Sequence, residues 1–159
     1  MKATSKTHNN YAKHIKDFKF LGTFSSKDKQ SELTLVPFIE QHSLHEYKDI
    51  SGVYLICIHG ANLFDDPIVF YVGQTIISIV GRICQHLRSF DDPTWGNECS
   101  GKSFIRMCVD TRQLFDIHYI ESNILGIEDD IDSIIAEKSY QKIFNPIVKD
   151  MKHSNLKYD

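Results

Sequence analysis

The pattern of apolar and polar positions predicts strands in the middle of this chain. Four short runs are rich in β-branched and aromatic residues: 53–58, 68–72, 104–109 and 115–120. Turn residues separate the first two runs over a stretch longer than a tight hairpin needs. We therefore expect these two runs to form a hairpin with an enlarged loop.

Apolar residues recur at helical spacing in two later segments. Isoleucines three and four residues apart predict a helix over about residues 76–89, with Thr75 as its N-terminal cap. Similar spacing predicts a second helix over about residues 129–143, which ends before Pro146. Between these two helices, residues 91–102 are expected to form a loop.

The first third of the chain is less regular. Residues 1–32 are polar apart from a small apolar and aromatic group at Phe18, Phe20, Leu21 and Phe24, so we expect an arm that docks through this group. Residues 33–39 are apolar but contain Pro37, which favours an edge segment. We predict one compact domain, with an extension over 1–45 and a domain proper over 46–159.

Composition excludes some classes of protein. The chain has 159 residues, of which 42% are hydrophobic and 25% charged, as in ordinary globular proteins. It contains no run of about 18 apolar residues, the length expected of a membrane-spanning helix. Its first residues also lack the apolar stretch of a secretory signal, so a cytoplasmic location is expected.

The four cysteines form no Cys-x-x-Cys pair, so we interpret them as reduced structural residues. Zinc binding by Cys84, His86 and Cys99 is an alternative, although this spacing matches no common ligand pattern.

Charge is unevenly distributed along the chain. The net charge is −3, yet residues 1–30 hold seven lysines against two aspartates, and residues 138–159 hold five lysines against two aspartates. Residues 121–132 carry five acidic side chains and no basic one. The lysine-rich ends are either solvated tails or contacts to a phosphate backbone.

Two tripeptides carry the strongest functional signal. Gly52-Val53-Tyr54 begins the first predicted strand and Tyr71-Val72-Gly73 ends the second. Glycine permits a close approach of backbone or ligand at these positions. Arg82 and His86 follow four residues apart, on one face of the predicted helix. Two phenols beside a cationic helix would make a site for holding and attacking a phosphate.

These elements resemble the GIY-YIG nuclease family, which is named for its two tripeptides. The family's Arg-x-x-x-His element matches Arg82 to His86, and its helical glutamate matches Glu137. The resemblance covers about residues 50–148. It implies an α+β fold in which helices flank a small central, mainly antiparallel three-stranded sheet. The family's terminal asparagine corresponds to Asn145, or Lys149 replaces it, or this role is absent.

The resemblance implies a metal-dependent endonuclease that leaves 5′-phosphate and 3′-hydroxyl ends on double-stranded DNA. Mg²⁺ or Mn²⁺ would be its cofactor, held by a single carboxylate. Each proposed role also has a plain structural alternative, such as a packed strand tyrosine or a solvated helix arginine. The implied roles are metal binding by Glu137, charge stabilisation by Arg82, general base by Tyr54, water or phosphate positioning by Tyr71, orientation of Tyr54 or proton acceptance by His86, and a catalytic place for Asn145.

Nucleic acid is expected to contact Gly73, Gln74, Arg88 and Lys149. The catalytic side chains are expected to converge in one shallow cleft. Family members of this size imply a restriction-type enzyme, which could act as a homodimer on palindromic sites. The alternatives are a homing or mobile-element nuclease and a catalytically weak nucleic-acid-binding module.

Overall fold

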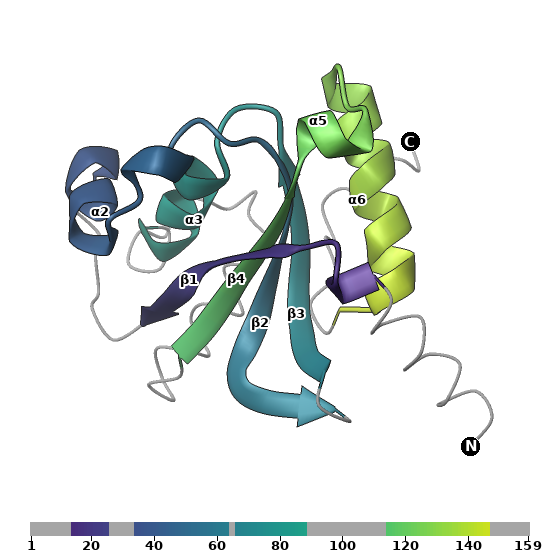
Figure 1. Cartoon of the computed structure of the whole chain (residues 1–159), viewed down its shortest axis with the longest axis horizontal. Coiled ribbons are helices and arrows are strands. Elements are labelled where there is room, and N and C mark those ends of the chain that lie inside the picture. Colours follow the sequence, from purple (N-terminus) through teal and green to yellow (C-terminus); the bar gives the residue numbers. More distant parts are fainter. Residues whose placement is uncertain (1–13, 26–33, 64–65, 89–113, 147–159) are drawn as a thin grey trace.

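The chain folds around a four-stranded antiparallel sheet with helices on both sides (Figure 1). The structure is a computed structural model and describes residues 14–25, 34–63, 66–88 and 114–146. In chain order its elements are β1 (Lys19–Ser25), α2 (Leu35–His42), the 3₁₀ helix η1 (His45–Tyr47), β2 (Gly52–Leu63), β3 (Asp66–Thr75), α3 (Ile79–Arg88), β4 (Leu114–Glu121), α5 (Ser122–Leu125) and α6 (Asp130–Phe144). Within these residues, no helix is long and apolar enough to cross a membrane.

The strand order is β1-β4-β2-β3, and each neighbouring pair is antiparallel. The prediction of an α+β fold with an antiparallel sheet is confirmed, but the expected three strands are wrong. The fourth strand is β1, which lies in the predicted arm and pairs with β4, so that Phe24 stands opposite Phe115. The extension 1–45 therefore contributes one strand of the sheet and helix α2.

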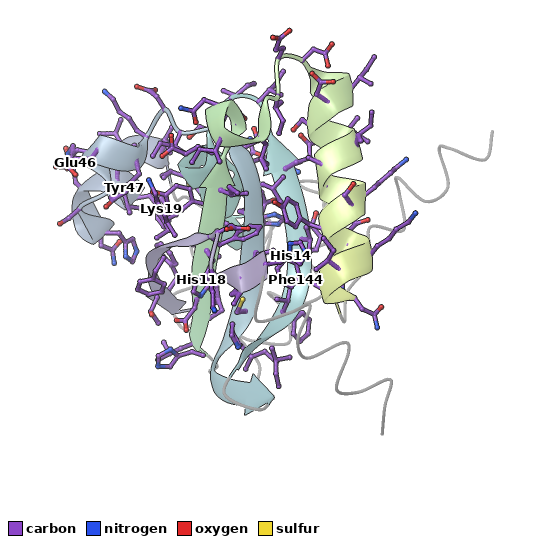
Figure 2. The ribbon with its side chains drawn as sticks, turned by 45° about the vertical axis from the view of Figure 1, so that its right-hand side comes forward. His14, Lys19, Glu46, Tyr47, His118 and Phe144 are labelled. Carbon is purple, nitrogen blue, oxygen red and sulfur yellow. The ribbon has the colours of Figure 1, made fainter. Side chains whose placement is uncertain are left out.

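Alternating side chains of the sheet build two apolar cores, one on each face. In β2, Tyr54 and Ile56 face the core that α2 and α3 cover. Their neighbours Val53 and Leu55 face the core that α6 covers. Figure 1 shows this arrangement, with α2 and α3 on one side of the sheet and α6 on the other. Figure 2 shows Phe144 and His14 together near α6, and Tyr47, the last residue of η1, on the other side of the sheet.

Two predictions of local structure are wrong for identifiable reasons. Residues 33–39 were expected to form an edge segment, but Leu35–His42 is a helix. Pro37 lies in its first turn, where a backbone N–H has no intrahelical partner and proline is tolerated. The next helix, α3, begins at Ile79, because the Ser78 hydroxyl accepts the Gly81 N–H at 3.0 Å and caps it. Thr75 instead accepts the Ile77 N–H at 3.1 Å within a turn.

The residues between the two tripeptides lengthen the strands of the hairpin. β2 extends to Leu63 and β3 begins at Asp66, with irregular register between Ile56 and Cys57 and between Ile58 and Asn62. The extra residues are thus accommodated by bulges and a longer ladder, and the predicted enlarged loop is wrong. The predicted strand 104–109 and loop 91–102 lie outside the described residues.

Candidate functional site

Packing explains why both tripeptides contain glycine. Gly52 has a φ of 150°, and a Cβ there would overlap the Ile120 carbonyl oxygen. Gly73 stands directly opposite Tyr54 in the β2–β3 ladder, and a Cβ on Gly73 would overlap the Tyr54 ring. The glycine of one tripeptide therefore makes room for the tyrosine of the other.

The two tyrosines and His86 form one buried cluster on the α3 side of the sheet. The Tyr54 Oη and His86 Nε2 atoms lie 2.8 Å apart in a hydrogen bond. The Tyr71 ring centroid is 6.2 Å from that of Tyr54 and 5.4 Å from that of His86. The structure thus brings together three predicted site residues from two strands and one helix.

Burial keeps the imidazole of His86 neutral. The pKa of His86 falls to about 3, mainly because burial disfavours the imidazolium and also because of the positive charge of Arg82. A weakly basic imidazole is a poor acceptor for a catalytic proton. Of the two roles expected for His86, the geometry and the pKa favour orienting the Tyr54 hydroxyl.

Arg82 lies one helical turn before His86 on α3. Its side chain is half-buried, and Nη1 donates to Gln85 Oε1 at 2.8 Å. The positive charge that opposes protonation of His86 also favours negative charge on a nearby oxygen. A developing phenolate or a phosphate oxygen would both be stabilised there.

Glu137 belongs to α6, on the other face of the sheet from the tyrosines. Its side chain is 3% exposed, and Oε1 accepts the Gln141 Nε2 donor at 3.2 Å. One turn earlier, the Ser133 hydroxyl donates to Gln74 Oε1 at 2.5 Å. Both β2 and β3 are contacted by α3 and by α6, so these two strands lie between Glu137 and the tyrosine cluster.

Glu137 offers carboxylate oxygens, which Mg²⁺ and Mn²⁺ prefer, but one of them accepts the Gln141 amide N–H and the residue is 3% exposed. An ion that retains most of its water needs more room than this buried carboxylate has, so the observed arrangement does not fit it. Among the described residues, no group of three or more His, Cys, Asp or Glu side chains could hold a metal ion.

Other predicted site residues are not brought to this cluster. Asn145 is the exposed C-cap of α6 with a φ of 46°, a left-handed conformation that asparagine tolerates. It follows Glu137 by just over two helical turns, about 12 Å of helical rise. Arg88 is the last residue of α3, with its side chain outside the described part of the structure, and Lys149 lies outside it altogether.

Sequence reasoning missed Ser133 and Gln141. Both lie on the same stripe of α6 as Glu137, because positions four and eight residues apart share a helical face. This spacing was visible in the sequence. The isoleucines of the same helix gave a stronger periodic pattern than the polar residues did. Two of them, Ile131 and Ile135, are nevertheless exposed in the structure.

Within the described residues, the catalytic side chains do not converge in the expected shallow cleft, because Glu137 lies across the sheet from the two tyrosines. Tyr54, Tyr71, His86 and Glu137 are each 3% exposed or less. A cavity of about 410 Å³ lies elsewhere, between α6, the segment after α5 and His14. It is lined mainly by apolar groups, including Leu125, Ile135 and Tyr140.

Comparison of the chain with family models, curated proteins and solved structures gives no match.

Proposed function

We propose that this protein is a metal-dependent endonuclease that hydrolyses phosphodiester bonds of double-stranded DNA to 5′-phosphate and 3′-hydroxyl ends. One observation carries the proposal. Tyr54 is hydrogen-bonded to His86, and Tyr71 packs against both rings. Three of the residues that carry the family resemblance thus meet in space, although the sequence separates them, while Glu137 lies across the sheet from them.

In the proposed reaction, a water molecule attacks the phosphorus atom and the bond to the 3′-oxygen breaks. Tyr54 would act as its phenolate, having lost its proton to solvent, and would take a proton from the water to become the phenol, while the neutral imidazole of His86 holds its oxygen in place. The departing 3′-oxygen would take a proton from solvent. Arg82 stabilises the negative charge that accumulates on the phosphate oxygens, for which a guanidinium is well suited. Tyr71 positions the water or a phosphate oxygen beside Tyr54.

Glu137 would hold Mg²⁺ or Mn²⁺ through its carboxylate. When bound, such an ion supplies positive charge that polarises phosphate and stabilises a leaving oxygen. Because Glu137 is 3% exposed, its carboxylate would have to become accessible to solvent before a hydrated ion could bind it.

The test is cleavage of a supercoiled plasmid by purified protein with Mg²⁺ or Mn²⁺. Glu137→Gln and Arg82→Ala should each reduce the rate by about 100-fold or more, the usual effect of removing transition-state stabilisation. Asp130→Asn is the matched control, since Asp130 is exposed on the same helix as Glu137 and should be dispensable. Wild-type rates in either site variant would remove that residue from the mechanism.

The burial of the cluster favours a second candidate, a nucleic-acid-binding module with little catalytic activity. Tyr54 is fully buried, whereas a general base must reach the attacking water. Folded wild-type protein that binds DNA but leaves the plasmid intact with both ions would select this candidate. Where cleavage occurs, sequencing the ends separates a restriction-type enzyme with a short palindromic site from a homing-type nuclease.

A further inference from the structure

A groove runs along helix α6 and is lined by residues other than those of the candidate site. It is the cavity of about 410 Å³ that α6 shares with the segment after α5 and with His14. From Asp132 to Ile143 this cavity, which we name the α6 groove, follows the helix for about 16 Å. Its α6 residues recur at intervals of three and four, so they form one stripe of the helix: Asp132, Ile135, Ala136, Ser139, Tyr140 and Ile143.

The two ends of the α6 groove differ. Figure 1 shows α5 beside the start of α6, so the segment after α5 lies at the Asp132 end. His14 lies at the other end, where the centroid of its ring is 6.5 Å from that of Tyr140. A molecule that fills the groove therefore meets two chemically distinct ends.

Isoleucines beside the α6 groove are exposed. Ile135 lines the groove and is 58% exposed, Ile131 one turn earlier is 67% exposed, and Ile124 of α5 is 59% exposed. Single exposed apolar residues are normal, but several around one concave apolar surface are typical of a binding site. Helix α6 thus turns part of its isoleucine pattern outward and buries Ser133 and Glu137 against the sheet.

The end of the groove nearest α5 is acidic. Glu128, Asp129 and Asp130 are exposed there, and Asp132 lines the groove itself. Within the described part of the chain, none of these four carboxylates takes part in an ion pair. Asp129 caps α6 by accepting the Asp132 N–H at 2.8 Å, and one carboxylate is enough for that purpose. The other three give this end a negative potential beyond what the helix start needs.

We propose that the α6 groove binds a basic amphipathic helix of a partner protein. The apolar side chains of this helix lie over Ile135 and Tyr140, and lysine or arginine at one of its ends faces Asp132. This binding site is separate from the proposed catalytic residues, and the inference does not depend on DNA cleavage.

The shape of the groove selects a helix. A length of about 16 Å corresponds to three helical turns, over which apolar side chains at i, i+3 or i+4 and i+7 point into the groove. The long wall of the groove is itself a helix, whose backbone groups bond to one another. An extended segment would therefore gain no ladder of main-chain hydrogen bonds from α6.

The charge selects a basic protein over other occupants. DNA and anionic membranes are negatively charged, so the acidic end of the groove repels both. Two copies of this chain that met groove to groove would leave both concave surfaces unfilled. A convex partner with positive charge at one end satisfies both the shape and the potential of the site.

The experiment uses the full chain and a fluorescent 14-residue peptide of leucine and lysine, with leucines at helical spacing. Affinity is measured by fluorescence anisotropy. A scrambled peptide of the same composition and a leucine–glutamate peptide should each bind at least about tenfold more weakly, since one loses the apolar stripe and the other the charge. Ile135→Ser should weaken binding of the leucine–lysine peptide about tenfold, because it removes exposed apolar surface that the peptide covers. Glu128→Gln combined with Asp130→Asn should weaken it about threefold and reduce its salt dependence.

Two matched controls change the same residue types away from the groove. Ile77→Ser alters an isoleucine that is 80% exposed in the turn before α3. Glu46→Gln alters an exposed carboxylate of η1, which Figure 2 shows on the opposite side of the molecule from α6. Both variants should bind the leucine–lysine peptide as the wild type does. All the changed side chains are exposed, so each variant should fold.

Wild-type affinity in Ile135→Ser would overturn the inference, as would failure of the wild type to bind the leucine–lysine peptide. Equal losses in Ile135→Ser and Ile77→Ser, or in the acidic double variant and Glu46→Gln, would overturn it as well by showing unspecific attraction. Analytical ultracentrifugation tests the remaining occupant: a dimer that Ile135→Ser dissociates would assign the groove to a second copy and overturn the proposal. Peptide binding is measured without DNA or metal, so the inference and the proposed function can fail independently.

Discussion

Single residues in this protein depend on one another across the β2–β3 hairpin. Gly73 has no side chain, and the Tyr54 ring occupies the space that a Cβ would need. The ring in turn places its hydroxyl 2.8 Å from His86 Nε2. Glycine, tyrosine and histidine therefore form one packing unit, and a change in any of them affects the other two.

Gly73→Ala should destabilise the fold and displace Tyr54 from His86. The added methyl group overlaps the ring, and overpacking of this kind costs about 1–3 kcal/mol. Urea denaturation measures the loss. Gly81→Ala is the control, because a Cβ on this α3 glycine would meet only the Ser78 side chain at 3.4 Å. It should stabilise the protein by about 0.5–1 kcal/mol through helix propensity. Equal stability of both variants would contradict the packing argument.

The stability of the protein should fall as pH falls below about 6.5, because of His86. Its pKa is about 3 in the folded state against 6.5 as the ordinary value, so the unfolded chain binds more protons in this range. The contribution is fully present above pH 6.5. It should be lost on acidification at up to about 1.4 kcal/mol per pH unit, as measured by denaturation between pH 7 and 4.

His86→Gln should show a smaller slope of stability against pH than the wild type. Some slope remains in both proteins, because burial also lowers the pKa of His42 and of His118. Identical slopes in wild type and His86→Gln would show that His86 is not held neutral by the fold.

At the scale of elements, the described structure depends on β1, a strand that the sequence pattern does not predict. β1 lacks clean alternation: Phe24 is 2% exposed, while Phe20 on the same strand is 55% exposed. The Phe24 ring contacts Phe38 of α2 and Phe115 of β4. Through this ring, β1 connects its neighbouring strand β4 to helix α2.

Phe24→Ala should cost about 3 kcal/mol or more, the usual result of truncating a buried phenylalanine. Phe20→Ala, a matched change on the same strand, should stay within about 0.5 kcal/mol of the wild type. Thermal or urea denaturation of both variants measures the difference. Similar losses at the two positions would mean that β1 is not packed as described.

Periodicity predicted the elements whose pattern is strong and local. The cores of β2 and β3, the strand β4 and the helix α6 were found within a few residues of their observed bounds. α2 was missed because Pro37 argues against a helix unless it lies in the first turn, and the start of a helix is hard to place from sequence. The cap of α3 was misplaced for the same reason, since Thr75 and Ser78 are both suitable caps.

At the scale of the whole molecule, sequence could not predict how the elements combine. Nothing local to 19–25 shows that it pairs with 114–121, because that register depends on the assembled sheet. The same limit applies to the candidate site. Its residue types could be chosen from motifs, but the placement of Glu137 across the sheet from Tyr54 follows from the three-dimensional arrangement of α6.

The strand order has a consequence for synthesis on the ribosome. β2 and β3 are adjacent in sequence and can pair soon after they emerge. β1 can pair only when β4 has been made, and Asp116 of β4 lies 93 positions after its hydrogen-bond partner Thr23 in β1. Until β4 is available, the backbone N–H and C=O groups on one edge of β2, and those of β1, have no partner strand. Insertion of β4 between β1 and β2 pairs both strands at once, so the sheet is completed in a single late step, after residue 121 has emerged from the ribosome.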